Sequence, residues 1–194
     1  MLVLLGVTIL SVLFFTFILP QKHDLDTLKP TSDIPIADIN YYYQRNPIWT
    51  NDIIGKSNST IGAEGCLLTC VSISAEKITG KNTTPKDFNT AMTKVDGFDE
   101  KAILLWEKVG QAVESLCYQI KESFSVKTIE DDLKGGYFPL VKVKLGGIGP
   151  THWVMIIGSK DGEFMIHDPL SNKQTALPLS THGKIYAYRI IVKN

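Results

Sequence analysis

The chain has 194 residues, and its 20 basic side chains balance its 20 acidic ones, so the formal net charge is zero. No cluster of Lys or Arg is present, which argues against nucleic-acid binding, because that function needs a basic surface to neutralise phosphates. The sequence contains no internal repeat and no low-complexity tract.

The first 19 residues contain no charged side chain. Such a run is about the length needed to cross a hydrocarbon core of about 30 Å. No Lys or Arg precedes Lys22 and no small-x-small cleavage site follows the run, whereas a secretory signal peptide has a basic start and such a site. We therefore favour a transmembrane anchor over residues 1–20, with a cleaved signal peptide as the alternative. Either one predicts a membrane-anchored or secreted protein whose domain lies outside the cytoplasm.

The next segment, 21–39, follows Pro20, is polar, contains two further prolines and shows no helical period, so it is interpreted as a linker. Residues 40–194 remain, which is enough for one domain with a substantial core.

Helices are predicted in the first half of this domain. In 65–80, apolar or small residues recur at helical spacing up to a glycine stop at Gly80. In 82–95, Thr84 is a candidate N-cap and Pro85 takes the first helical position.

Two further helices are expected downstream. The segment 99–110 has an apolar side made of Ile103, Leu104, Trp106 and Val109. In 128–136, Thr128 and Asp131 resemble a capping box, and a glycine pair ends the helix.

The pattern then changes to short segments that are rich in β-branched and aromatic residues, which indicates strands. These segments are 137–145, 152–159, 163–168 and 184–192. Asp161-Gly162 predicts a hairpin between the second and the third. Helices followed by an antiparallel meander predict an α+β domain in two layers.

Three residues form a candidate catalytic set: Cys66 at a helix start, His152 at the start of a strand, and Asp168 at the end of the next strand. A hairpin near Gly162 would bring His152 and Asp168 together on one face, close enough for a hydrogen bond.

The chemistry gives this set a function. A helix N-terminus favours the thiolate, which is the nucleophilic form of cysteine. An imidazole can complete its activation, and a carboxylate can orient that imidazole. The Cys66 N–H supplies one donor for an oxyanion hole. Gly65 would let a substrate backbone approach.

The segments "YYYQRNPIW", "STIGAEGCLLT", "THWVMIIG" and "IHDPLS" resemble the bacterial papain-like cysteine peptidases related to the peptidase that trims double-glycine leaders from bacteriocins. The likeness runs from Tyr41 to about Leu170. It implies a papain-like fold with N-terminal helices packed on a C-terminal sheet, with Cys66 as nucleophile, His152 as general base and acid, and Asp168 as the orienting residue.

The resemblance also implies an oxyanion glutamine upstream of the nucleophile, and Gln44 is the candidate. In papain-like enzymes this glutamine lies closer to the cysteine, at the place that Thr60 occupies here.

Other interpretations of the three cysteines stay open. In an oxidising compartment Cys70 and Cys117 are the more plausible disulfide, because bridging Cys66 and Cys70 on one helix strains it. Without a bridge, Cys70 and Cys117 are expected to be buried and inert. A metal site is disfavoured because no second close pair of ligands follows.

Two further histidines are given structural roles. His167 adjoins Asp168, but strand alternation turns it to the opposite face. His182 lies in a predicted loop, where a solvated side chain is the default expectation.

The sequence therefore predicts a cysteine peptidase that cleaves a peptide or amide bond through an acyl-enzyme, without a cofactor or a metal. Its partners would be a peptide or protein substrate and, through the N-terminal segment, a membrane. The alternatives are a catalytically inactive papain-like domain that binds a peptide or cell-wall partner, and a transferase or amidase that uses the same residues.

Overall fold

The computed structural model describes residues 28–194. The predicted anchor or signal peptide over 1–20 lies outside these residues. Among the helices of 28–194, none combines the length and the apolar character that a membrane span requires.

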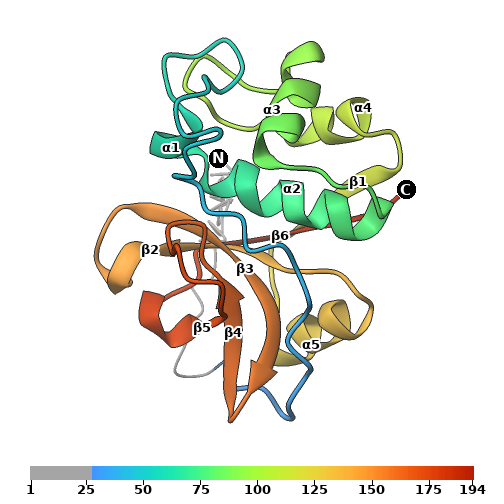
Figure 1. Ribbon diagram of the computed structural model, residues 1–194. Coiled ribbons are helices and arrows are strands. Elements are labelled where there is room, and N and C mark those ends of the chain that lie inside the picture. The colour runs from blue at the N-terminus through green and yellow to red at the C-terminus, as the bar shows by residue number, and fades with distance from the viewer. Residues whose placement is uncertain (1–27) are drawn as a thin grey trace, which may run out of the picture.

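The described residues form an α+β domain in which four helices lie together above an antiparallel sheet (Figure 1). The helices are α1 (Ile61–Glu64), α2 (Cys66–Thr79), α3 (Pro85–Lys94) and α4 (Val109–Ala112). Helix α2 lies between its neighbours and the sheet, and its buried side includes Leu68, Val71 and Ala75. The predicted α+β class is therefore confirmed.

Two of the predicted helices have the expected ends. Helix α2 stops at Gly80, whose φ of 67° places it in the left-handed region, which glycine adopts without strain. Helix α3 begins after Thr84, whose side chain accepts a hydrogen bond from the Asp87 N–H, and the Asp87 carboxylate accepts one from the Thr84 N–H in return.

The prediction of a helix over 99–110 is wrong for most of this segment. The Asp99 carboxylate accepts hydrogen bonds from the N–H groups of Lys101 and Ile103, at 2.9 and 2.8 Å, so the chain turns instead of coiling. Only a short 3₁₀ helix, η2 (Trp106–Lys108), and α4 follow. Ile103, expected on the buried side, is 57% exposed.

The helix α5 (Val126–Lys134) starts one turn earlier than predicted, because Ser125 is its N-cap and Thr128 occupies the third helical position. Lys121 and Tyr188 donate hydrogen bonds to Asp132 of this helix, at 2.7 and 2.6 Å, which ties α5 to two strands of the sheet.

The sheet has the strand order β1-β6-β2-β3-β4-β5, and every neighbouring pair is antiparallel. Its strands are β1 (Leu116–Lys121), β2 (Leu140–Lys144), β3 (Thr151–Lys160), β4 (Glu163–His167), β5 (Leu177–Pro178) and β6 (Ala187–Lys193). Three of the four predicted strands, β2, β3 and β4, are therefore sequential neighbours, whereas the fourth, β6, returns to lie between β2 and β1, and β5 was not expected. Strand β1 was not expected, and Cys117 on it is exposed rather than buried.

The predicted hairpin joins β3 and β4. Asp161 and Gly162 both have positive φ, 53° and 75°, and Lys160 pairs with Glu163. Two positive φ values give the turn that matches the twist of the two strands.

The described part of the predicted linker packs on the domain. Ile34 pairs with Ser159 of β3, and Glu130 of α5 accepts a hydrogen bond from the Thr31 N–H at 2.6 Å. This segment crosses β3 at Gly158, where a Cβ would lie 2.8 Å from the Pro35 carbonyl oxygen. From residue 28 onward the chain is therefore held against the sheet.

Candidate active site

Cys66 is the first residue of α2, directly after the short helix α1 and the joining residue Gly65. Its side chain is half-buried. The first N–H groups of a helix have no partner within the helix, and the helix dipole places partial positive charge there. The thiol therefore lies beside backbone N–H groups that have no partner within the helix.

The glycine before Cys66 has a packing role. A Cβ on Gly65 would lie 2.5 Å from the Ile61 carbonyl oxygen and 2.7 Å from Ile61 Cγ2. Gly65 was expected to admit a substrate backbone; the structure shows a further role, because it lets α2 start tightly against α1. The position of Cys66 depends on that junction.

His152 and Asp168 are brought together by the sheet. His152 is the second residue of β3, and Asp168 directly follows β4. His152 Nε2 lies 2.7 Å from Asp168 Oδ1, and the same oxygen accepts a hydrogen bond from the Leu170 N–H at 2.8 Å. Both side chains are buried, so solvent screens this pair little.

The charges of this pair support one another. Burial would lower the pKa of His152, but hydrogen bonds to Asp168 and Cys66, with the attraction of both groups, raise it to about 9. Burial would raise the pKa of Asp168, but the contacts with His152 and His182 hold it well below its ordinary value. Near neutral pH the pair is therefore an imidazolium and a carboxylate.

Cys66 reaches the same imidazole. Its side chain is a hydrogen-bond partner of His152, together with Asp168. Because Asp168 occupies Nε2, the thiol has only Nδ1 to bond to. The structure thus brings together three of the four predicted site residues as a chain of thiol, imidazole and carboxylate.

Gln44, the fourth, lies behind the turn that leads to Cys66. Its Nε2 donates to the Gly62 carbonyl of α1 at 3.0 Å, and its backbone N–H donates to the Pro169 carbonyl at 2.8 Å. Its side-chain oxygen is buried without a partner. Thr60, the alternative position, is the N-cap of α1 and accepts a hydrogen bond from the Ala63 N–H.

The two histidines given structural roles differ in outcome. His167 is buried away from Cys66, edge-on to the Tyr41 ring at 5.5 Å, and burial lowers its pKa to about 4. His182 was expected to be solvated, but it is 4% exposed and its Nε2 lies 3.5 Å from Asp168 Oδ2. No motif around His182 indicated this, because the contact depends on how a loop folds back.

The cysteines are all free thiols, so the alternative of a Cys70–Cys117 disulfide is not found. Cys70 lies fully buried one turn below Cys66, where its Sγ is 3.8 Å from the Trp153 carbonyl oxygen. Burial, with the nearby Cys66 and Asp168, raises the pKa of this thiol well above its ordinary value. Within residues 28–194, no group of three or more His, Cys, Asp or Glu side chains is placed to hold a metal ion.

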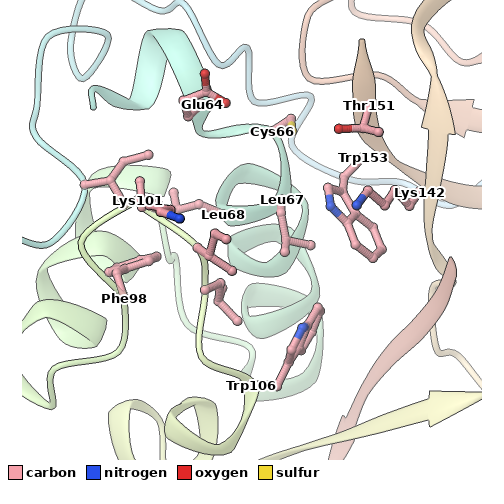
Figure 2. A pocket seen from close by; sticks show the side chains of 14 residues that line it. Glu64, Cys66, Leu67, Leu68, Phe98, Lys101, Trp106, Lys142, Thr151 and Trp153 are labelled. Atoms are coloured by element: carbon pink, nitrogen blue, oxygen red, sulfur yellow. The ribbon is translucent and has the colours of Figure 1, made fainter. Parts of the chain in front are cut away.

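A pocket of about 290 Å³ opens beside Cys66 (Figure 2). Its wall comes from α1, α2, the loop after α3, β2 and β3. It combines the apolar Leu67, Phe98, Trp106 and Trp153 with the charged Glu64, Lys101 and Lys142. The indole rings of Trp106 and Trp153 lie 6.2 Å apart. Trp153, which follows His152 on β3, therefore lines the cleft.

Comparison with solved structures supports a peptidase fold. The chain superposes on a crystal structure from Bacillus anthracis that is provisionally described as a C39-like peptidase, with a TM-score of 0.57 and 11% identity. The match covers 84% of this chain and 98% of that one. No model of a known protein family matches the sequence, and no curated protein is significantly similar to it. The likeness is thus one of fold.

Proposed function

We propose that this protein is a cysteine peptidase that cleaves a peptide or amide bond through an acyl-enzyme. The observation that supports it most is the contact of one buried imidazole with both a carboxylate and a thiol at a helix start. His152 holds the proton of the Cys66 thiol as an imidazolium, the Cys66 sulfur attacks the carbonyl carbon, and His152 then protonates the leaving amine. Asp168 fixes the tautomer and orientation of the imidazole. Water then hydrolyses the thioester.

The oxyanion hole would be formed by the Cys66 N–H and the Gln44 amide. The Gln44 Nε2 carries two hydrogens, and the Gly62 carbonyl takes one, so the other is free to donate. The bond to Gly62 also fixes the side chain beside the turn that carries Cys66. Donors that are already in place need no reorganisation as charge develops on the substrate oxygen.

The pocket supports a substrate with a bulky apolar side chain near the scissile bond. A cavity of about 150 Å³ is known to hold a benzene ring, so the 290 Å³ here leaves room for an aromatic side chain. A glycine would leave the apolar residues of this wall in contact with water. We therefore expect peptides with Phe or Leu beside the cleaved bond to be hydrolysed faster than peptides with Gly there.

The proposal is tested by alkylation with iodoacetamide near pH 7, followed by mass spectrometry of each cysteine. Cys117 is an internal reference, because it is an exposed thiol away from the site. Cys66 should react at least about tenfold faster than Cys117 because it lies at a helix start beside His152, the setting of reactive cysteines. A His152→Ala variant should remove this difference. Equal rates, or fastest labelling at Cys117, would contradict a catalytic Cys66.

Turnover needs its own test. Incubation with a library of peptides should give cleavage products and a covalent acyl adduct on Cys66, and a Cys66→Ala variant should give neither. If the wild-type protein binds peptides equally well as the variant and cleaves none, the protein is a papain-like binding domain instead.

We further propose that residues 1–20 tether the domain to a membrane, outside the cytoplasm. Cell fractionation of the full chain checks this. Recovery of the full-length chain in the soluble cytoplasmic fraction would contradict it.

A further inference from the structure

A second histidine lies behind the carboxylate of the candidate site. His182 ends the short 3₁₀ helix η4 (Leu179–His182), and its ring centroid is 5.9 Å from that of His152. Asp168 lies in contact with both imidazoles, because His152 Nε2 is 2.7 Å from Oδ1 and His182 Nε2 is 3.5 Å from Oδ2.

The protonation state of His182 follows from its other nitrogen. The Gly146 N–H donates to His182 Nδ1 at 3.4 Å, so Nδ1 carries no hydrogen. The ring hydrogen of the neutral tautomer is therefore on Nε2, which faces Asp168. Nε2 is fully buried and makes no hydrogen bond of ordinary geometry among the described residues; its contact with Asp168 Oδ2, at 3.5 Å, is a long one.

The two oxygens of Asp168 have unequal support. Oδ1 is bonded to His152 and to the Leu170 N–H, whereas His182 provides the contact of Oδ2. Asp168 is 8% exposed, so little water reaches the carboxylate. A buried carboxylate oxygen without a donor is costly, and rotation of the carboxylate would relieve that cost at the expense of the bond to His152.

The backbone around His182 is packed closely enough to hold the ring in place. A Cβ on Gly183 would lie 3.0 Å from Gly147 Cα, so η4 docks against the 3₁₀ helix η3 (Leu145–Gly147). This turn precedes β3, which carries His152. One residue thus contacts the orienting carboxylate and the turn that leads to the catalytic strand.

We propose that His182 is a positioning residue of this site: its Nε2–H holds Asp168 Oδ2, which keeps Oδ1 aimed at His152. The catalytic consequence rests on the proposed peptidase function, but the tautomer of His182 and its effect on His152 do not. The other titratable groups that interact electrostatically with Asp168 are Cys70, His152 and His167. Of these, only His152 bonds to the carboxylate.

The first test is independent of activity. Long-range ¹H–¹⁵N NMR of the imidazoles in the full chain should show His182 as the neutral tautomer with its hydrogen on Nε2. A hydrogen on Nδ1 would overturn the proposal, whatever the peptidase assays show.

The second test compares two replacements. In His182→Gln the side-chain amide can still donate to Oδ2, whereas His182→Leu fills the space without a donor. We expect kcat in His182→Leu to fall at least about tenfold with KM nearly unchanged, because His182 does not line the pocket. The alkaline limb of the pH profile should move down by about one unit, because a less firmly held carboxylate supports the imidazolium less.

His182→Gln should keep most of the wild-type kcat and profile. Ser180→Ala, on the exposed side of the same turn, is the matched control and should behave as wild type. Equal losses in both His182 variants would indicate a packing role and overturn the proposal. If His182→Leu unfolds, NMR titration of His152 in His182→Gln and in wild type still tests the proposal. The proposal requires His152 to titrate at the same pH in both proteins, and a difference would overturn it.

Discussion

His152 and His167 both lie near Asp168 and are both buried, on opposite faces of the sheet, but they differ in charge. Burial lowers the pKa of both imidazoles. The pKa of His167 is lowered to about 4, whereas the pKa of His152 is raised to about 9 by its hydrogen bonds to Asp168 and Cys66. Nearness to a carboxylate is therefore not sufficient, because His167 adjoins Asp168 in the chain and is still neutral.

The difference comes from the alternation of side chains along a strand. His167 ends β4 and turns toward the Tyr41 ring and the Tyr42 backbone. Asp168, one residue later, turns to the other face and meets His152. One residue of register thus separates a structural histidine from a candidate catalytic one.

Removing the Asp168 carboxylate should abolish the pKa difference between His152 and His167. In Asp168→Asn, His152 loses its anionic partner, and its pKa should fall from about 9 toward that of a buried histidine. The amide can still orient the imidazole, as the asparagine of papain-like enzymes does, so peptide hydrolysis should slow by less than the roughly 10⁴-fold loss seen in a serine hydrolase. Asp161→Asn in the exposed β3–β4 turn is the control. A His152 pKa that stays at about 9 in Asp168→Asn would contradict the assigned role.

The neutral histidine should make the fold sensitive to acid. The folded pKa of His167 lies below its unfolded value of about 6.5, so its contribution to stability is full above pH 6.5 and is lost as the pH falls through about 4. The loss amounts to about 3 kcal/mol. Urea denaturation at pH 7 and pH 4 should show a smaller drop in His167→Phe than in wild type. An identical drop in both would count against a buried, neutral His167.

Displacing the Cys66 thiol should lower the pKa of His152 and leave the pKa of His167 unchanged. In Gly65→Ala the new Cβ meets the Ile61 carbonyl, so the α1–α2 junction must shift, at a cost of about 1–3 kcal/mol. We expect slower alkylation of Cys66 and a lower pKa for His152 by NMR. Gly80→Ala, where a Cβ meets no atom, shows the effect of backbone strain alone. A larger change in the pKa of His167 than in that of His152 would contradict this prediction.

The smallest effect is expected at the second thiol of α2. Burial keeps Cys70 protonated. Cys70→Ser should therefore change the alkylation rate of Cys66 by no more than about twofold, and it should leave the titration of both histidines unchanged. A large drop in Cys66 alkylation would show that Cys70 takes part in the chemistry.

Much of the fold follows from local patterns. The end of α2 at Gly80, the cap of α3 at Thr84 and the Asp161-Gly162 turn depend on residues within a few positions, so they are visible in the sequence. The segment 99–110 has the apolar spacing of a helix, but the Asp99 side chain captures the backbone and turns it. Strand β1 was missed because much of it is exposed and its pattern is weak.

The site shows the same division. The sequence alone determined the residue types and the order of Cys66, His152 and Asp168, because a helix start and a hairpin register are local features. Only the tertiary structure decided that the thiol contacts the same imidazole as the carboxylate, that Gln44 is bonded to the turn before Cys66, and that His182 is buried behind Asp168. These contacts join segments far apart in the chain, and their geometry depends on how the helices and loops pack on the sheet.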